Sequence, residues 1–406
     1  MQGGIRCLAG VSLFLLFSQA VREENPLQPK LDFAPALEIE VLAEPVKSVR
    51  MGLLLWAPNP DGKTWDLLQI YFPEYGGPNT IVVIDLASEQ VRTVPTGRGW
   101  NFHLCPAVVA PNGQLFISIL DSRLRQRICL YDPATNELIL DAVKMPEELL
   151  GETHPLVLGT DGNLYAIGQH PSKAAAAAQI NPDTLQVTFY GAIGPSHDPN
   201  PCWGYSGGAD DRYIYIASGK IPWYLVAYDR QTGRWEVLAE TETVGGYVSV
   251  SQRPDGCTAS VTRGQNQPSE RYWLYQGKLI PQRRPDEPPP WPQREPLLRL
   301  PPKPEVDTSL ADPDEEGWAE IRVRFAKAQD WKRFRFQVPL YPQSIYRLRE
   351  MPDGRLFGTA GAYLGNFIYD PKTGKAQHLG KCPLSHYATA FLGGKIYMSG
   401  YPTSPL

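Results

Sequence analysis

Short apolar runs alternate with tight-turn sequences along most of the chain. One pattern is a turn followed by a strand, as in Asn112-Gly113 before 114–117 and Asp161-Gly162 before 163–166. Asp-Gly and Asn-Gly supply the positive φ angles that tight hairpins require. This pattern therefore predicts many short strands rather than helices. Its other members are Asp61-Gly62, Asp210-Asp211, Asp255-Gly256, Asp353-Gly354 and Gly393-Gly394.

A second pattern places an aromatic or aliphatic residue before a turn that begins with Asp or Asn. The first side chain caps the turn, Pro often fixes φ at the next position, and Gly or Asn takes the left-handed position. Both patterns advance by roughly 45–50 residues per repeat, so two independent signals share one period. The members are Ile84–Glu89, Tyr131–Asn136, Ile180–Thr184, Tyr228–Gly233 and Tyr369–Gly374.

Each period holds four short strands, and a period of roughly 40–50 residues with four strands is typical of a β-propeller. The chain is predicted to be all-β, with seven complete blades and a partial eighth, so that the propeller has six to eight blades. The alanine run 174–178 is expected to be a loop that enters a third strand. The last segment, 385–406, holds only two strands. Either an N-terminal strand such as Leu37–Leu42 completes this blade, or the sequence is the front part of a longer protein.

The first 20 residues are predicted to be a signal peptide. Arg6 precedes the apolar run Cys7–Phe17, and Ser18–Ala20 offers a small-x-small cleavage site. The apolar run is too short to span a membrane. Residues 21–44 then form an N-terminal segment, and 45–406 form the propeller. We expect a secreted or periplasmic protein with no membrane span after the signal is removed.

The stretch 281–307 interrupts the repeat with many prolines and charges of both signs. It is predicted to be an extended, polyproline-like insertion between the fifth and sixth blades, either a spacer or a strip that docks a partner. The net charge of −4 offers no electrostatic footprint for nucleic acid. The cysteines lack CxxC spacing, and most are expected to be buried apolar side chains.

The residues that line the central mouth of the propeller are predicted from the positions eight residues before the second residue of each hairpin turn. This register contains Cys105, His154, Trp203, Tyr346 and His386. Residues two positions away share the strand face, which adds His103 and Tyr205, while Tyr247 lies one residue out of register. The clustering of imidazoles and aromatic rings is the most informative chemical signal in the chain.

Three interpretations of this cluster remain open. Its members could fill the channel as bulky, mutually hydrogen-bonded side chains. Imidazoles from different blades, at His103, His154 and His386, could hold a divalent metal such as zinc or manganese, with His154, His386 and Tyr346 as catalytic groups. Alternatively, Trp203, Tyr205, Tyr247 and Cys105 could bind a ligand without catalysis, since aromatic rings suit stacking on sugars.

The repeats resemble the secreted bacterial propellers grouped as quinoprotein-like, YVTN-type and streptogramin-lyase-like families. Tyr369–Gly374 and Pro352–Phe357 carry this resemblance. It implies the fold but not an activity, since Asp161–Tyr165 lacks the Trp of the lyase motif and the tryptophans do not repeat as in quinone-binding propellers. Some propeller polysaccharide lyases resembled here use a His/Tyr centre with a divalent metal.

The sequence thus favours a secreted binding or interaction module for a small-molecule, carbohydrate or protein partner. The alternative is a secreted lyase or hydrolase, metal-dependent or not, that acts on a carbohydrate or small polar substrate.

Overall fold

The structure is a computed structural model of the chain. Every regular element in its described part is a β-strand, as predicted, and none of these residues lies in a helix able to cross a bilayer. The described residues are 46–73, 78–96, 100–101, 106–121, 123, 125–151, 155–196, 204–219, 222–241, 245–284, 287–292, 294–326, 328–343, 345–360, 365–380 and 385–401.

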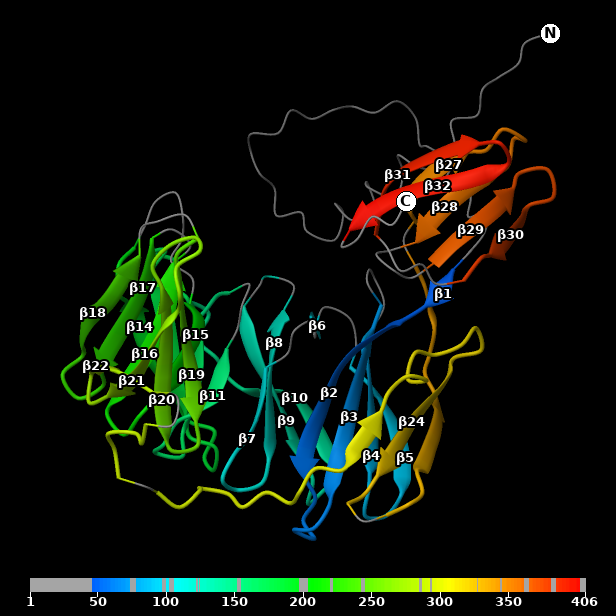
Figure 1. Cartoon of the computed structure of the whole chain (residues 1–406). Helices are drawn as coiled ribbons and strands as arrows, with labels where there is room; N and C mark the ends of the chain where they lie inside the picture. Colours follow the sequence, from blue (N-terminus) through cyan, green and yellow to red (C-terminus); the bar gives the residue numbers. More distant parts are fainter. Residues whose placement is uncertain are drawn as a thin grey trace.

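Successive antiparallel sheets form the blades of the predicted β-propeller (Figure 1). Blade 1 comprises β2 (Arg50–Pro58), β3 (Trp65–Phe72), β4 (Thr80–Asp85) and β5 (Gln90–Pro95). Blade 2 comprises β6 (Trp100–Asn101), β7 (Ala107–Val109), β8 (Leu115–Asp121), β9 (Gln126–Asp132) and β10 (Glu137–Val143). Blade 3 comprises β11 (Leu156–Leu158), β12 (Leu164–Gln169), β13 (Ala175–Ile180) and β14 (Val187–Ile193).

Blades 4 and 5 each have four strands. Blade 4 comprises β15 (Gly204–Ala209), β16 (Tyr213–Gly219), β17 (Trp223–Asp229) and β18 (Arg234–Thr241). Blade 5 comprises β19 (Tyr247–Arg253), β20 (Gly256–Thr262), β21 (Glu270–Tyr275) and β22 (Lys278–Pro281).

The later blades are less regular. Blade 6 has three strands, β23 (Glu305–Asp307), β24 (Trp318–Arg324) and β25 (Lys332–Gln337). Blade 7 comprises β27 (Ile345–Glu350), β28 (Leu356–Ala360), β29 (Gly365–Asp370) and β30 (Lys375–His378). The pair β31 (Ser385–Leu392) and β32 (Lys395–Tyr401) is the partial eighth blade, and β1 (Lys47–Ser48) pairs with β26 (Tyr341–Pro342).

The turn chemistry agrees with the sequence patterns. Gly113, Gly162 and Gly354 have φ of 85°, 81° and 84°, and Asn136 has φ of 56° in the second type of turn. The alanine run is an exception to the sequence interpretation. Residues 175–180 are the third strand of blade 3 itself and not a loop leading into it. The alanine side chains of β13 are buried: Ala176 and Ala178 pack toward blade 2, and Ala175 and Ala177 pack toward blade 4. Small methyl groups therefore fit where the neighbouring blades approach blade 3 on both faces.

Adjacent blades pack face to face through continuous apolar clusters. Blade 1 packs on blade 2, blade 2 on blade 3, blade 3 on blade 4 and blade 4 on blade 5. Because blades 1–4 are covered on both faces, their second strands are mainly apolar, and every residue of β3 and β8 is buried. The predicted burial of cysteines holds at Cys129 and Cys257, which have free thiols in these clusters.

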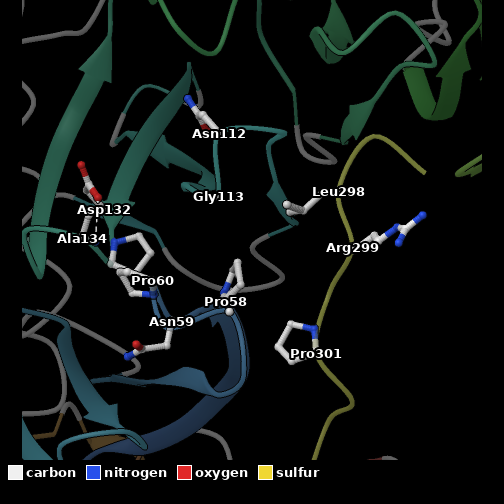
Figure 2. A pocket seen from close by; sticks show the side chains of 12 residues that line it. Pro58, Asn59, Pro60, Asn112, Gly113, Asp132, Ala134, Leu298, Arg299 and Pro301 are labelled. Atoms are coloured by element: carbon white, nitrogen blue, oxygen red, sulfur yellow. Dashed lines mark hydrogen bonds between the residues drawn. The ribbon is translucent and has the colours of Figure 1, made fainter. Parts of the chain in front are cut away.

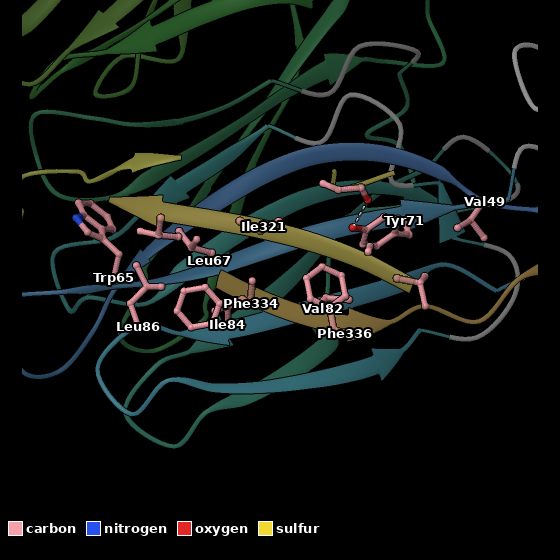
Figure 3. Packing of buried hydrophobic residues seen from close by; sticks show 14 residues of the cluster. Val49, Trp65, Leu67, Tyr71, Val82, Ile84, Leu86, Ile321, Phe334 and Phe336 are labelled. Carbon is pink, nitrogen blue, oxygen red and sulfur yellow. Dashed lines mark hydrogen bonds between the residues drawn. The ribbon is translucent and has the colours of Figure 1, made fainter. Parts of the chain in front are cut away.

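Blade 6 packs on the free face of blade 1. Ile321, Phe334 and Phe336 join Trp65 and Tyr71 in one cluster, which Figure 3 shows between the blue and ochre strands. The Tyr71 hydroxyl donates a hydrogen bond of 2.7 Å to the Ala311 carbonyl and ties the two blades together. The packing order is therefore 6-1-2-3-4-5, with blades 5 and 6 at the two ends.

The segment between β22 and β23, residues 282–304, is called the strap here. It crosses the ends of the blades where the first strand turns into the second, called the turn side below (Figure 1). Trp291 is 5% exposed and packs edge-on against Trp273 of blade 5 at 5.2 Å. Arg294 donates a hydrogen bond of 2.6 Å to Asp211 of blade 4, and the Trp65 indole donates one of 3.3 Å to the Pro302 carbonyl. The strap thus connects the two ends of the series.

Replacing Arg294 with glutamine should remove a pH-dependent contribution of the strap to stability. The Arg294 guanidinium lowers the pKa of Asp211 below its ordinary value. A carboxylate with a lowered pKa stabilises the folded state above its unfolded pKa, and this contribution is lost as the pH falls through the folded pKa. We expect the difference in unfolding free energy between wild type and Arg294→Gln, measured by urea titration, to shrink from pH 6 to pH 3. An unchanged difference over this range would contradict the assignment.

Candidate aromatic binding site

Only some of the residues predicted to line the mouth belong to the described part of the structure. His103, Cys105, His154 and Trp203 lie outside the described residues, and for His386 only the backbone pairing with Gly400 in blade 8 is described. Tyr346 lies on blade 7, 47% exposed, with the Arg347 guanidinium 5.8 Å from its ring centroid. Tyr205 and Tyr247 lie at the starts of the inner strands of blades 4 and 5, as predicted.

Tyr205 and Tyr247 meet through a third ring. The Trp223 ring centroid is 5.0 Å from that of Tyr205 and 4.8 Å from that of Tyr247, with interplanar angles of 50° and 70°. Tyr247 is 45% exposed, and the other two side chains are half-buried. Tilted and edge-on rings at these separations attract each other. The three residues form a partly open apolar surface, called the aromatic cluster below.

Two close contacts between the inner strands position this cluster. The Ser206 hydroxyl accepts a hydrogen bond of 2.9 Å from the Val250 amide, and the Gln252 side-chain oxygen accepts one of 2.8 Å from the Ala209 amide. Gly208 permits this approach, since a Cβ there would lie 2.8 Å from the Cys257 sulfur. Because β15 and β19 are held together along their length, their first residues lie close together at the edge of the blades opposite the turn side, called the rim below.

A buried hydroxyl without a partner lies beside the cluster. Thr241 is directly opposite Trp223 in the β17–β18 ladder, so the two side chains share a face. Thr241 is 4% exposed, and its Oγ1 has no hydrogen-bond partner among the described residues. Buried hydroxyls are normally satisfied, so Thr241 is an exception in this part of the structure, behind the aromatic surface.

Sequence reasoning missed Trp223 because it begins a third strand and has no equivalent in the repeat register. The antiparallel order of each blade provides a signal that could have found it. The third strand starts at the end of the blade where the inner strand starts, so its first residues reach the same rim.

Other buried polar groups have a structural role. Tyr131, Tyr165 and Tyr215 donate hydrogen bonds of 2.6–2.7 Å to Asp66, Asp161 and Asp210 near the turns. Burial and the nearby carboxylates raise the pKa of each tyrosine far above its ordinary value, so these hydroxyls stay protonated as donors. In the described ranges no three His, Cys, Asp or Glu residues converge to hold a metal.

The turn side also has a small cavity, of about 190 Å³. It lies between the turns of blades 1 and 2 and the strap, with Pro58, Pro60 and Pro301 in its wall (Figure 2). Asp132 already accepts a hydrogen bond of 3.1 Å from Gln114. The cavity therefore presents mainly proline rings and turn backbone, and it lies at the opposite ends of the strands from the aromatic cluster.

No protein-family model matches the chain, and no curated protein matches it. Solved propeller structures are similar over most of its length. The propeller domain of the Trilobed protease from Pyrococcus furiosus has 11% identity and a TM-score of 0.32, covering 82% of this chain and 96% of that one. A streptogramin B lyase has 11% identity and a TM-score of 0.33, covering 78% and 92%. An oligogalacturonate lyase in complex with manganese has 12% identity and a TM-score of 0.33, covering 86% and 88%.

Proposed function

We propose that this chain is a secreted carbohydrate-binding module that holds its ligand at the rim between blades 4 and 5. The observation that supports this is the contact of Trp223 with both Tyr205 and Tyr247 in a partly exposed surface. Secretion is supported by the signal peptide that the sequence predicts at residues 1–20.

The chemistry of the cluster suits a sugar ring. A pyranose has apolar C–H faces and a polar edge, so it needs an apolar platform with hydrogen-bonding groups beside it. Tyr and Trp supply a large apolar area and a polar tip, and sites of this kind combine aromatic walls with a few placed polar groups. Thr262 is half-buried and lies directly opposite Tyr247 in its ladder, so it can supply such a group.

The test is a glycan array probed with the chain from residue 21 onward, followed by calorimetry on the best binder. Tyr247→Ala and Trp223→Ala should each weaken binding roughly tenfold or more, as expected for the loss of about 1.5 kcal/mol of aromatic contact. Tyr247→Ala is the more informative of the two variants because Tyr247 is exposed, so its replacement should leave the fold intact.

Trp235→Ala is the matched control. Trp235 is 45% exposed on the outer strand of blade 4, at the turn end. It should leave the affinity unchanged. Binding to no glycan, or affinity that survives both Tyr247→Ala and Trp223→Ala, would overturn the proposed function.

A further inference from the structure

Blade 5 has two chemically different faces. Val248, Val250 and Val261 are buried against blade 4. The alternate positions of the inner two strands are serine and threonine, half-buried or exposed. Together with three basic residues they form what we call the outward face, comprising Ser249, Ser251, Arg253, Thr258, Ser260, Thr262, Arg271 and Lys278.

The strand register places these side chains in rows. Ser249 is opposite Ser260, and Ser260 is opposite Arg271 on the next strand. Ser251 is opposite Thr258, and Tyr247 is opposite Thr262 at the rim. The rows therefore lead from the aromatic cluster down the sheet as a continuous hydroxyl-bearing surface.

No other blade covers this face in the described part of the chain. Blade 6, which follows in sequence, packs on blade 1 instead, and Figure 1 shows β24 well separated from β19 and β20. Only the lower end of the face is covered, where Trp291 of the strap lies on Trp273.

The charges on this face are all positive. Its charged residues on β19–β22 are Arg253, Arg271 and Lys278, with no carboxylate at an outward position of these strands. Arg253 pairs with Asp255 of the adjoining turn at 3.2 Å. Arg271 and Lys278 are exposed and form no ion pair with any residue that the structure describes.

The corresponding face of blade 6 differs. Arg322 pairs with Glu320 at 2.6 Å, and Arg324 pairs with Glu305. Arg333 and Arg335 lie on the same face of blade 6, and neither forms an ion pair with a described residue. The two end blades therefore differ in their carboxylates, which occur at outward positions of the blade 6 strands and not of the blade 5 strands.

We infer that the outward face of blade 5 binds an anionic polysaccharide whose uronate carboxylates meet Arg271 while its rings follow the serine and threonine rows from Tyr247. This deepens the proposed function and rests on it. The Arg271 guanidinium can hold a carboxylate with two parallel hydrogen bonds. The positive face of an otherwise acidic chain, with net charge −4, gives the charge complementarity.

The experiment compares two matched probes on the full chain from residue 21: cellohexaose and the same hexamer oxidised to the uronate at C6. These differ only in hydroxymethyl against carboxylate. We expect the uronate to bind roughly tenfold more tightly by calorimetry, as expected for one charge-assisted hydrogen-bonded pair. Arg271→Gln should remove this preference. Raising ionic strength from about 0.01 to 1 M shortens the screening length from ~30 to ~3 Å and should also reduce it.

Arg333→Gln on blade 6 is the control, since Arg333 is also an exposed outward arginine on a third strand. It should change neither affinity. Equal affinity for the two hexamers, or a uronate preference that Arg271→Gln leaves intact, would overturn the inference while the Tyr247→Ala result still reports on the proposed function. Sedimentation tests whether the face instead binds a second copy of the chain. If the wild type self-associates and Arg271→Gln does not, the face belongs to that interface and the inference is overturned.

Discussion

Replacing Trp65 with alanine is expected to lower the free energy of unfolding by about 3–5 kcal/mol, the usual cost of truncating a buried aromatic residue. Trp65 is 1% exposed in the cluster between blades 1 and 6, and its ring packs edge-on against Trp56 at 5.8 Å. Its indole also donates to the Pro302 carbonyl, and the Lys303 ammonium lies 5.4 Å from its ring. One substitution therefore removes contacts to three segments.

Urea unfolding followed by circular dichroism measures this loss. Trp235→Ala serves as the control because Trp235 is 45% exposed and outside the interblade clusters, so its effect should stay within about 0.5 kcal/mol. If Trp65→Ala cost no more than Trp235→Ala, blade 6 would not pack on blade 1 as described.

Replacing Gly207 with alanine should lower the free energy of unfolding by about 3 kcal/mol, at the upper end of the usual loss for overpacking a core. A Cβ at Gly207 would lie 2.0 Å from the Ile167 Cδ1 and 2.8 Å from the Tyr215 carbonyl oxygen. Blades 3 and 4 meet at this point, so the new methyl group must displace the Ile167 side chain of blade 3 and press on the β16 backbone of its own blade. The loss is again read from urea unfolding.

A double-mutant cycle isolates the cause. Ile167→Val removes the methyl group nearest to the new Cβ, so Gly207→Ala should cost less in that background than in the wild type. Gly354→Ala provides a contrast, since nothing lies within 4 Å and only its φ of +84° opposes a side chain, at a cost of about 1 kcal/mol. Additive effects of Gly207→Ala and Ile167→Val would contradict the steric explanation.

The blades themselves were predictable because their signals are local. Asn112-Gly113 and Tyr131–Asn136 specify turns through the φ angles of a few residues, and the structure places turns at both. The alanine run at 174–178 was misread because alanine has no strand preference of its own. Its strand state comes from pairing with β12 and β14, which local sequence does not reveal.

The candidate site was predictable only in part. The repeat register located Tyr205 and Tyr247 near the starts of inner strands, where the structure has them, and their place at a central mouth stays a prediction. Trp223 was not placed with them, since its contact with Tyr205 depends on the strand order within blade 4. Its contact with Tyr247 depends on how blades 4 and 5 approach each other through Gly208 and Ser206. The predictions for His103, His154, Trp203 and Cys105 concern residues outside the described part, and those for His386 and Tyr346 remain predictions.

The sequence by itself determined the four-stranded unit, its period and its turns, because tight turns and strand alternation depend on neighbouring residues. Only the tertiary structure decided which blade faces meet. The alternation in β20, β24 and β25 indicates one buried face each, but an apolar face does not specify its partner. Ile321 and Phe334 could in principle cover blade 5 or blade 1, and that choice depends on the complementarity of whole surfaces. The same choice leaves the serine and threonine rows of blade 5 uncovered.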